Sequence, residues 1–348
     1  MNLSQTVKLI QQQTSPVVLK DGWMTTTTPN LTISARGPFE GVDVTIPSAE
    51  LAAVAAVADE DDLNYSVVGS RMTIKSGPSK WAIRLSDPDM LQMRGPERQD
   101  TAQFSLSKAD IEKIVLVSKA VDKREERNEM NGVKLEHYNG GVYAVATDGI
   151  SLIRRFLIRH ETPFSLPVLL PISVVSLLYA LPIADGEAHI AMGDKTISVA
   201  VPGLRFTHRL TEAEFVPYRD MFGARINPEA VRVDTADLLN GIKLATVLRS
   251  RADKRCPVSI TGEGTTVSVT HESEGMPSVS DMGGEVIYPI DLHADAAKLH
   301  TAIRALQSPR ISIRHKKALD MAILHPSEDE SFDITTGDFA VIAPMRKG

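Results

Sequence analysis

Two side chains in this sequence have the types and neighbours that covalent or acid–base chemistry would need, the carboxylate of Asp148 and the thiol of Cys256. Asp148 precedes a glycine at the end of an apolar run, a context that is typical of a turn and only rarely of a catalytic acid. The pKa of Cys256 would fall if Lys254 and Arg255 lay close to its sulfur. Its place at the start of an alternating segment instead favours a small buried residue.

The sequence lacks the patterns by which proteins commonly bind metals and nucleotides. Its nine histidines form neither a His-x-x-x-His nor a His-Glu-x-x-His arrangement, and a single cysteine excludes a zinc site made of thiolates. No glycine-rich phosphate loop of the Walker or dinucleotide type is present. We therefore expect no cofactor and no metal, and an enzyme is the less favoured class.

Length and composition indicate a multidomain protein with sizeable cores. The chain has 348 residues, of which 43% are hydrophobic and 24% charged, and one hydrophobic core rarely organises so long a chain. The single cysteine suits a reducing compartment. The most apolar stretch, residues 166–184, contains three prolines and therefore predicts short buried elements, not a membrane span. The first residues lack the apolar core of a secretory signal, so we expect a cytoplasmic protein with no membrane partner.

The elements that would position functional groups repeat three times along the chain. Each repeat opens with an amphipathic helix whose first turn can be capped by a Ser or Asp side chain, at Ser4, Ser107 and Asp234. Two alternating segments joined by a glycine-bearing turn follow each helix. A second apolar helix and another hairpin come next, and these helices are predicted to begin near Pro47, Pro171 and Asp291. The pattern predicts three α+β domains at residues 1–103, 104–223 and 224–348.

Several stretches of the sequence resemble one protein family, and they occur in the family's order. The middle third contains Gly132-Val-Lys-Leu-Glu136 and Val145-Ala-Thr-Asp-Gly149, which resemble the middle domain of the bacterial sliding clamp, the β subunit of DNA polymerase III. The segment 210–219 resembles the clamp's linker into its third domain, and the segment 341–346 resembles its terminal signature. In the first repeat, Met72-Thr-Ile-Lys-Ser-Gly77 resembles a strand of the clamp's first domain.

The resemblance implies a fold, an assembly and a set of partners. The fold is α+β, with three similar domains of the DNA-clamp type in each chain. Two chains join head to tail as a homodimer, and the six domains close a ring with helices lining the hole and sheets outside. Such a ring is not an enzyme: it encircles double-stranded DNA without reading its sequence and tethers the replicative DNA polymerase. A clamp-loader ATPase opens it.

Contact with DNA would have to come from local charge, because the chain carries 38 basic and 44 acidic residues and a net charge of −6. Modest, salt-sensitive phosphate contacts suit a protein that slides. The resemblance places basic residues on hole-facing helices and in two loops at equivalent helix ends. The candidate DNA-contacting residues are Lys8, Lys108, Lys113, Lys123, Arg124, Arg127, Lys243, Arg249, Arg251, Lys254, Arg255 and Lys298.

The resemblance also implies an apolar cleft between the second and third domains, which takes the Leu and Phe anchors of short partner peptides. Its methionines suit a site that repacks around different partners. The candidate lining residues are Met130, Thr147, Gly149, Ile150, Leu152, Val216, Met221, Met321, Val341, Ala343, Pro344 and Met345. The chain departs from the family at two of these places, since Ile150-Ser-Leu152 replaces His-Arg-Leu and Ala343 replaces a methionine.

An alternative with the same fold is a scaffold or decoy that binds clamp-binding peptides without encircling DNA. The basic residues Lys8, Arg124 and Arg127 argue against it. Salt-sensitive retention on circular but not on linear DNA would separate the two functions.

Overall fold

The computed structural model describes residues 7, 15–87, 102–122, 124, 128–161, 168–183, 186–193, 195–210, 213–221, 227–248, 255–273, 275–317, 320–328 and 332–345. The chain forms two compact units, one made of residues 1–109 and 176–211 and the other of residues 110–175 and 212–348. The predicted first helix of the first repeat lies outside the described residues except for Val7, which is helical and buried. The three domain boundaries remain predictions.

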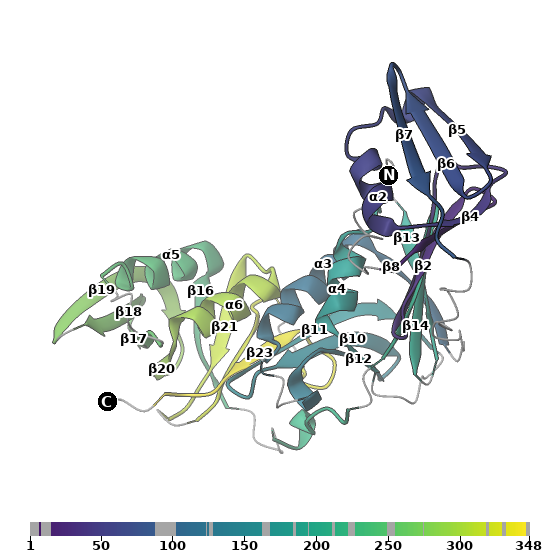
Figure 1. Ribbon diagram of the computed structural model, residues 1–348. Helices are drawn as coiled ribbons and strands as arrows, with labels where there is room; N and C mark the ends of the chain where they lie inside the picture. The colour runs from purple at the N-terminus through teal and green to yellow at the C-terminus, as the bar shows by residue number, and fades with distance from the viewer. Residues whose placement is uncertain are drawn as a thin grey trace. The chain divides into compact units, whose positions relative to one another are not determined.

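The first unit contains an eight-stranded antiparallel sheet and a separate three-stranded sheet (Figure 1). Its strands alternate as a half-buried sheet requires, as when Ala102, Phe104 and Leu106 point into the core. In spatial order the eight strands are β4 (Asp43–Ile46), β1 (Val17–Lys20), β2 (Trp23–Thr27), β3 (Leu31–Arg36), β15 (Leu204–Arg209), β14 (Thr196–Val201), β13 (Glu187–Met192) and β8 (Ala102–Ser107). The smaller sheet consists of β5 (Leu63–Val68), β6 (Arg71–Ser76) and β7 (Ser79–Arg84).

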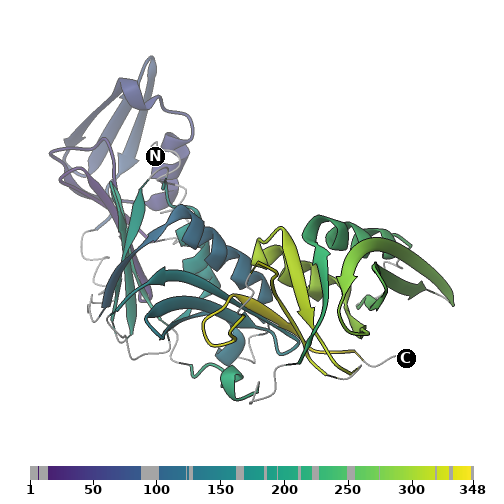
Figure 2. The same ribbon diagram turned by 180° about the vertical axis from the view of Figure 1, so that it is seen from behind.

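The second unit contains one continuous ladder of twelve antiparallel strands. Figure 2 shows β23, near the end of the chain, lying beside β11 from the middle of the chain. In spatial order the strands are β12 (Val168–Leu170), β9 (Val133–Tyr138), β10 (Gly141–Thr147), β11 (Ser151–Arg159), β23 (Phe339–Ile342), β22 (Ala322–Pro326), β21 (Arg310–Arg314), β16 (Glu229–Asp234), β19 (Met276–Val286), β18 (Thr266–Ser273), β17 (Pro257–Glu263) and β20 (Asp291–Asp295).

Five helices of eight or more residues occur in the described part of the chain. They are α2 (Ser48–Ala55), α3 (Lys108–Val117), α4 (Ile172–Tyr179), α5 (Thr235–Ala245) and α6 (Ala296–Leu306). In the second unit α5 and α6 lie side by side against the strands (Figure 1). None of the helices in the described ranges is both long and apolar enough to cross a membrane.

One predicted helix begins at a different residue from the one expected. The third repeat's second helix was expected to begin near Asp291, but Asp291–Asp295 is the strand β20, and the helix α6 begins at Ala296. The carboxylate of Asp295 is the cap, since it accepts from the backbone N–H groups of Ala297 and Lys298 at 2.9 and 3.1 Å. Either aspartate could cap a helix, and the pairing of residues 291–295 with β17 decides for the second.

With this correction the repeat becomes regular. The helices α2, α4 and α6 begin at Ser48, Ile172 and Ala296, each 124 residues after the one before. The strand order repeats as well. Each helix is preceded by the outer strand of a four-strand set, and the three sets are β4-β1-β2-β3, β12-β9-β10-β11 and β20-β17-β18-β19.

The second unit also buries an arginine completely. Arg154 of β11 is 1% exposed, and its guanidinium carbon lies 3.7 Å from the ring centroid of Tyr143. The guanidinium donates to the carbonyl oxygens of Ile334, Thr335 and Gly337 at 3.2, 2.8 and 3.2 Å. Arg154 therefore fastens the segment that leads into β23 to the middle of the sheet.

Replacing Arg154 should destabilise the fold strongly. In Arg154→Met three carbonyl oxygens lose their donor and the buried carboxylate of Glu136 loses a cation that lies 3.7 Å away, so we expect the free energy of unfolding to fall by about 3 kcal/mol or more. Urea denaturation followed by circular dichroism measures the change. The matched control is Arg159→Met at the exposed end of the same strand, which should change the free energy by less than about 0.5 kcal/mol. Equal effects of the two substitutions would contradict this account.

Candidate functional site

An apolar cluster in the second unit gathers residues from four distant parts of the chain. Its buried members are Tyr143, Val145, Leu152, Leu169, Phe215, Tyr218, Ile323, Phe339 and Val341. Partly buried side chains border it, namely Tyr138, Phe156, Ala213, Val216, Met321, Phe332 and Ile334. We call these sixteen residues the apolar cluster and the partly buried ones its rim.

Four of the predicted peptide-contacting residues belong to the apolar cluster. Leu152 and Val341 are directly opposite each other in the β11–β23 pairing and are 6% and 4% exposed. Val216 and Met321 stand at the rim and remain partly accessible. These four residues come from β11, from the linker, from the segment before β22 and from β23, and the fold brings them into one cluster.

The turn between β10 and β11 carries three further predicted residues, Thr147, Gly149 and Ile150. The hydroxyl of Thr147 accepts from the backbone N–H of Gly149 at 3.1 Å and donates to the carbonyl of Ser151 at 2.7 Å. Gly149 has a φ of +82°, in the left-handed region where glycine is favoured. The turn is therefore built for this backbone path, and it ends where Leu152 enters the apolar cluster.

Asp148 organises this turn. Its Oδ1 atom accepts from the backbone N–H groups of Ile150 and Ser151 at 2.9 and 2.7 Å. Its Oδ2 atom pairs with the ammonium of Lys298 on α6. Burial would raise the pKa of Asp148, but the hydrogen bonds from Lys298 and the two backbone groups outweigh it and hold the pKa below its usual value. Asp148 is thus a structural turn residue.

The last described residues run along the same turn. The N–H of Ala343 donates to the carbonyl of Ile150 at 2.8 Å, and that of Met345 donates to the carbonyl of His293 at 2.8 Å. Ala343, Pro344 and Met345 are all half-buried. They adjoin the turn without being members of the apolar cluster.

Two predicted pocket residues lie elsewhere or are only partly described. Met130 is buried at 7% exposure in a short helix (Asn128–Met130), and it is not a member of the apolar cluster. Met221 ends the short helix Tyr218–Met221, where only its backbone is described.

The linker is fixed to β9 by a group of charges that sequence reasoning did not single out. Glu136 is 7% exposed, and its carboxylate accepts from the hydroxyl of Tyr218 and from the guanidinium of Arg219 at 2.7 Å. The ammonium of Lys134 lies 3.1 Å from the same carboxylate. Burial would raise the pKa of Glu136, but the Tyr218 hydroxyl and the two cations outweigh it and lower the pKa. For Tyr218, burial and the neighbouring carboxylate raise the pKa.

The predicted DNA-contacting residues are distributed over several elements. Lys8, Lys123, Arg127, Arg249, Arg251 and Lys254 lie outside the described residues. Lys108, Lys243 and Arg255 are exposed. Lys113 pairs with Asp110 at 3.1 Å, and Arg124 pairs with Asp122 at 2.5 Å while its side chain stays 59% exposed. Lys298 pairs with Asp148, so its charge is partly neutralised by the protein itself.

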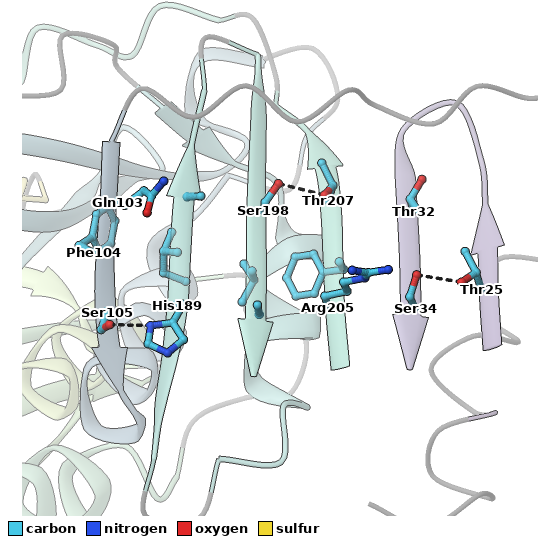
Figure 3. A pocket seen from close by; sticks show the side chains of 15 residues that line it. Thr25, Thr32, Ser34, Gln103, Phe104, Ser105, His189, Ser198, Arg205 and Thr207 are labelled. Carbon is cyan, nitrogen blue, oxygen red and sulfur yellow. Dashed lines mark hydrogen bonds between the residues drawn. The ribbon is translucent and has the colours of Figure 1, made fainter. Parts of the chain in front are cut away.

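A second concave surface lies on the eight-stranded sheet of the first unit. Figure 3 shows this polar trough, of about 680 Å³. Its hydroxyl groups pair across neighbouring strands, Thr25 with Ser34 at 2.9 Å and Ser198 with Thr207 at 2.9 Å. The Ser105 hydroxyl also lies 3.0 Å from Nδ1 of His189, but the described lining residues include no carboxylate that could orient this imidazole as a base.

Comparison with known proteins connects this architecture to one family. A family model for the central domain of the DNA polymerase III beta subunit matches residues 105–217. The beta sliding clamp of Buchnera aphidicola is 27% identical over 168 residues, which are 47% of this chain and 45% of that protein. The beta sliding clamp of Chlamydia pneumoniae is 25% identical over 274 residues, 75% of this chain and 74% of that protein.

The fold as a whole matches solved clamps. The DNA polymerase sliding clamp of Pseudomonas aeruginosa superposes with a TM-score of 0.85 over 99% of this chain and 97% of that one, at 17% identity. A putative DNA polymerase III beta subunit from Eubacterium rectale gives 0.84 over 99% and 98%, at 14% identity. The chain is similar to β sliding clamps in its central sequence and in its whole fold.

The structural match confirms the predicted fold class, an α+β chain of the DNA-clamp type. The curated relatives are named beta sliding clamps, which supports the prediction that the protein is not an enzyme. The matched central segment, residues 105–217, contains β9, β10 and β11 and ends in the linker. The family match therefore includes the turn at Asp148 and much of the apolar cluster.

The charges around Glu136 predict an acid sensitivity. Because its folded-state pKa lies below the ordinary value of 4.5, the stabilisation from ionised Glu136 is complete above that pH and is lost as the pH falls through the folded-state pKa. Between about pH 5 and about pH 3, the urea midpoint of the wild type should therefore fall more steeply than that of Glu136→Gln. The exposed Glu263→Gln is the matched control and should keep the wild-type slope. Equal slopes for the wild type and Glu136→Gln would refute the assignment.

Proposed function

We propose that this chain is a sliding clamp, a non-catalytic processivity factor that encircles duplex DNA as a head-to-tail homodimer and tethers a replicative DNA polymerase through its apolar cluster. The observation that carries the proposal is the repeated strand order, which leaves one sheet junction incomplete within a single chain. A partner copy would supply the missing half.

The two complete junctions follow one rule. The set β4-β1-β2-β3 joins β15-β14-β13-β8 through β3 and β15, and the set β12-β9-β10-β11 joins β23-β22-β21-β16 through β11 and β23. The third set, β20-β17-β18-β19, ends in β19, and the strands that remain in the described part of the chain are β7-β6-β5. By the same rule β19 should join β7.

The edges of both strands carry no strand partner along most of their length in the described part of the chain. On the side away from β18, β19 pairs with β16 only over Gly284–Val286, which leaves the edge of Met276–Met282. β7 pairs only with β6. Unpaired backbone edges invite pairing with another chain. If β7 of each copy joins β19 of the other, a two-fold dimer makes two equivalent junctions and closes.

Exposed apolar side chains support the same contact. Val247 and Leu248, which follow α5, are 71% and 66% exposed, and α5 packs on β18 and β19. In the first unit Val68 at the end of β5 is 78% exposed and Val57 after α2 is 69% exposed. Large apolar side chains that gather on an exposed surface are typical of an interface.

The charges suit loose contact with DNA. The chain is acidic overall, so attraction to phosphates must be local and weak, which permits sliding once the ring is closed. The exposed Lys108, Lys243 and Arg255 are the described candidates for such contacts. A clamp-loader ATPase would be needed to open the ring around circular DNA.

The rim of the apolar cluster supports peptide docking. The buried members of the apolar cluster, which include Leu152 and Val341, form its floor. Above them, four rim residues remain partly exposed, namely Val216, Met321, Phe332 and Ile334. Apolar side chains of a partner, such as Leu and Phe, would extend this packing, as helix or strand anchors do in other peptide grooves.

Leu248→Asp tests the dimer. A charge in a dry apolar contact is costly, so we expect the wild type to have about twice the mass of 37.9 kDa and the variant to dissociate at micromolar concentration. Light scattering on a sizing column over a dilution series measures both. Tyr179→Asp, an equally exposed site on α4, should stay dimeric. A wild type that is monomeric at every concentration would refute the ring and would favour a peptide-binding scaffold.

Retention on DNA tests encirclement. Loaded onto nicked circular plasmid with a bacterial clamp loader and ATP, the wild type should remain with the plasmid through a large-pore column at moderate salt. It should be lost when the plasmid is cut once, because a ring slides off a free end. Leu248→Asp should not be retained on either form. Retention that survives linearisation would indicate ordinary DNA binding and contradict the proposal.

A further inference from the structure

We propose that Lys298 is a positioning residue of the peptide site: through Asp148 it holds the turn between β10 and β11 in the shape that receives a partner peptide. This inference rests on the proposed function of the apolar cluster. It gives Lys298 a role different from DNA contact, which its residue type and its place on α6 had suggested.

One carboxylate connects the helix to the turn. Oδ2 of Asp148 pairs with the ammonium of Lys298, whereas Oδ1 accepts from the N–H groups of Ile150 and Ser151 and from the Ser151 hydroxyl at 3.1 Å. The side chain of Asp148 is 9% exposed and that of Lys298 is 34% exposed. The ion pair is therefore shielded on the side of the turn and accessible on the side of the helix.

Among the described residues, the ion pair of Lys298 with Asp148 is the charged contact between α6 and the turn. The other hydrogen bonds of the turn join its own residues or lead to the segment after β23, where the N–H of Ala343 donates to the carbonyl of Ile150 at 2.8 Å. Without Lys298 the carboxylate of Asp148 would remain buried without its cation, which is unfavourable for the ionised form. The turn would relieve this by opening toward water, and Ile150 and Ala343 would move with it.

A displaced turn would reach the peptide site directly. Ser151 and Leu152, which follow the turn, pair with Ile342 and Val341 of β23. Leu152 and Val341 form part of the floor of the apolar cluster. Lys298 thus acts on peptide affinity through Asp148 and the turn, without needing to touch the peptide.

Peptide binding by the full-length protein tests the inference. The probe is a fluorescein-labelled peptide with a terminal Leu-Phe pair, and the same peptide with Ala-Ala in its place is the control for specific binding. In fluorescence anisotropy Lys298→Met should bind the Leu-Phe peptide about fivefold or more weakly than the wild type, and Lys298→Arg should restore most of the affinity. Lys243→Met on α5 is the matched control, because it removes an exposed lysine from the neighbouring helix, and it should bind as the wild type does.

A double-variant cycle separates positioning from a general loss of fold. Asp148→Asn should weaken binding as Lys298→Met does, and the double variant should be no weaker than either single one, since both remove the same pair. Circular dichroism and retention on nicked circular DNA should stay at wild-type levels for Lys298→Met. Wild-type peptide affinity in Lys298→Met, or a loss of DNA retention alone, would overturn the inference. A wild type that does not distinguish the two peptides would instead refute the proposed peptide site.

Discussion

The pairing of β11 with β23 joins two segments that lie far apart in the sequence of the second unit, and the proposed peptide site depends on it. The register places Leu152 opposite Val341 and Arg154 opposite Phe339. Side chains alternate along a strand, so a slip by one residue would turn Leu152 or Val341 away from the apolar floor to the opposite face of the sheet. Three features follow from this one register. They are the floor of the apolar cluster, the hydrogen bonds of Arg154 to the segment before β23, and the contact of Ala343 with the turn at Ile150.

Buried charges cluster around that junction, and each has a partner. Arg155 pairs with Asp338 at 2.9 Å, Lys298 pairs with Asp148, and Glu136 receives Tyr218 and Arg219. Buried ion pairs contribute little net stability, but a single wrong register would leave several charges unpaired at once. Their main effect here is to penalise alternative pairings. The apolar cluster alone could not do this, because apolar contacts tolerate many arrangements.

Local signals in the sequence predicted the repeats well. The Asp cap at Asp234 and the glycine-bearing hairpin turns act within a few residues, so they can be recognised from the sequence alone. The start of α6 was misplaced because Asp291 and Asp295 both satisfy the capping rule, and only the pairing of β20 with β17 assigns the first to a strand. Residues of the site that lie on strands, such as Tyr143 and Val145, share one face with Thr147 and could have been found from this alternation.

The rest of the site depends on contacts between residues far apart in the sequence. Nothing local to Glu136 indicates that Tyr218 will lie against it, and nothing local to Lys298 indicates that its partner is Asp148. A basic residue on a helix of a DNA-related protein is naturally assigned to DNA, and its pairing within the chain becomes visible only once the fold is known. Family resemblance found Leu152, Val216, Met321 and Val341, because their positions are defined by motifs.

The open edges of β7 and β19 also have a geometrical consequence. Every copy carries one edge of each kind, so the pairing rule by itself permits copies to be added without limit. In the proposed ring, closure after two copies depends on curvature, because the bends contributed by the repeats must add up to a full turn. Small changes in the packing of helices on strands, even far from the edges, would alter that sum and turn a closed ring into an open spiral. Natural selection on core packing in such a chain would therefore also act on the shape of the assembly.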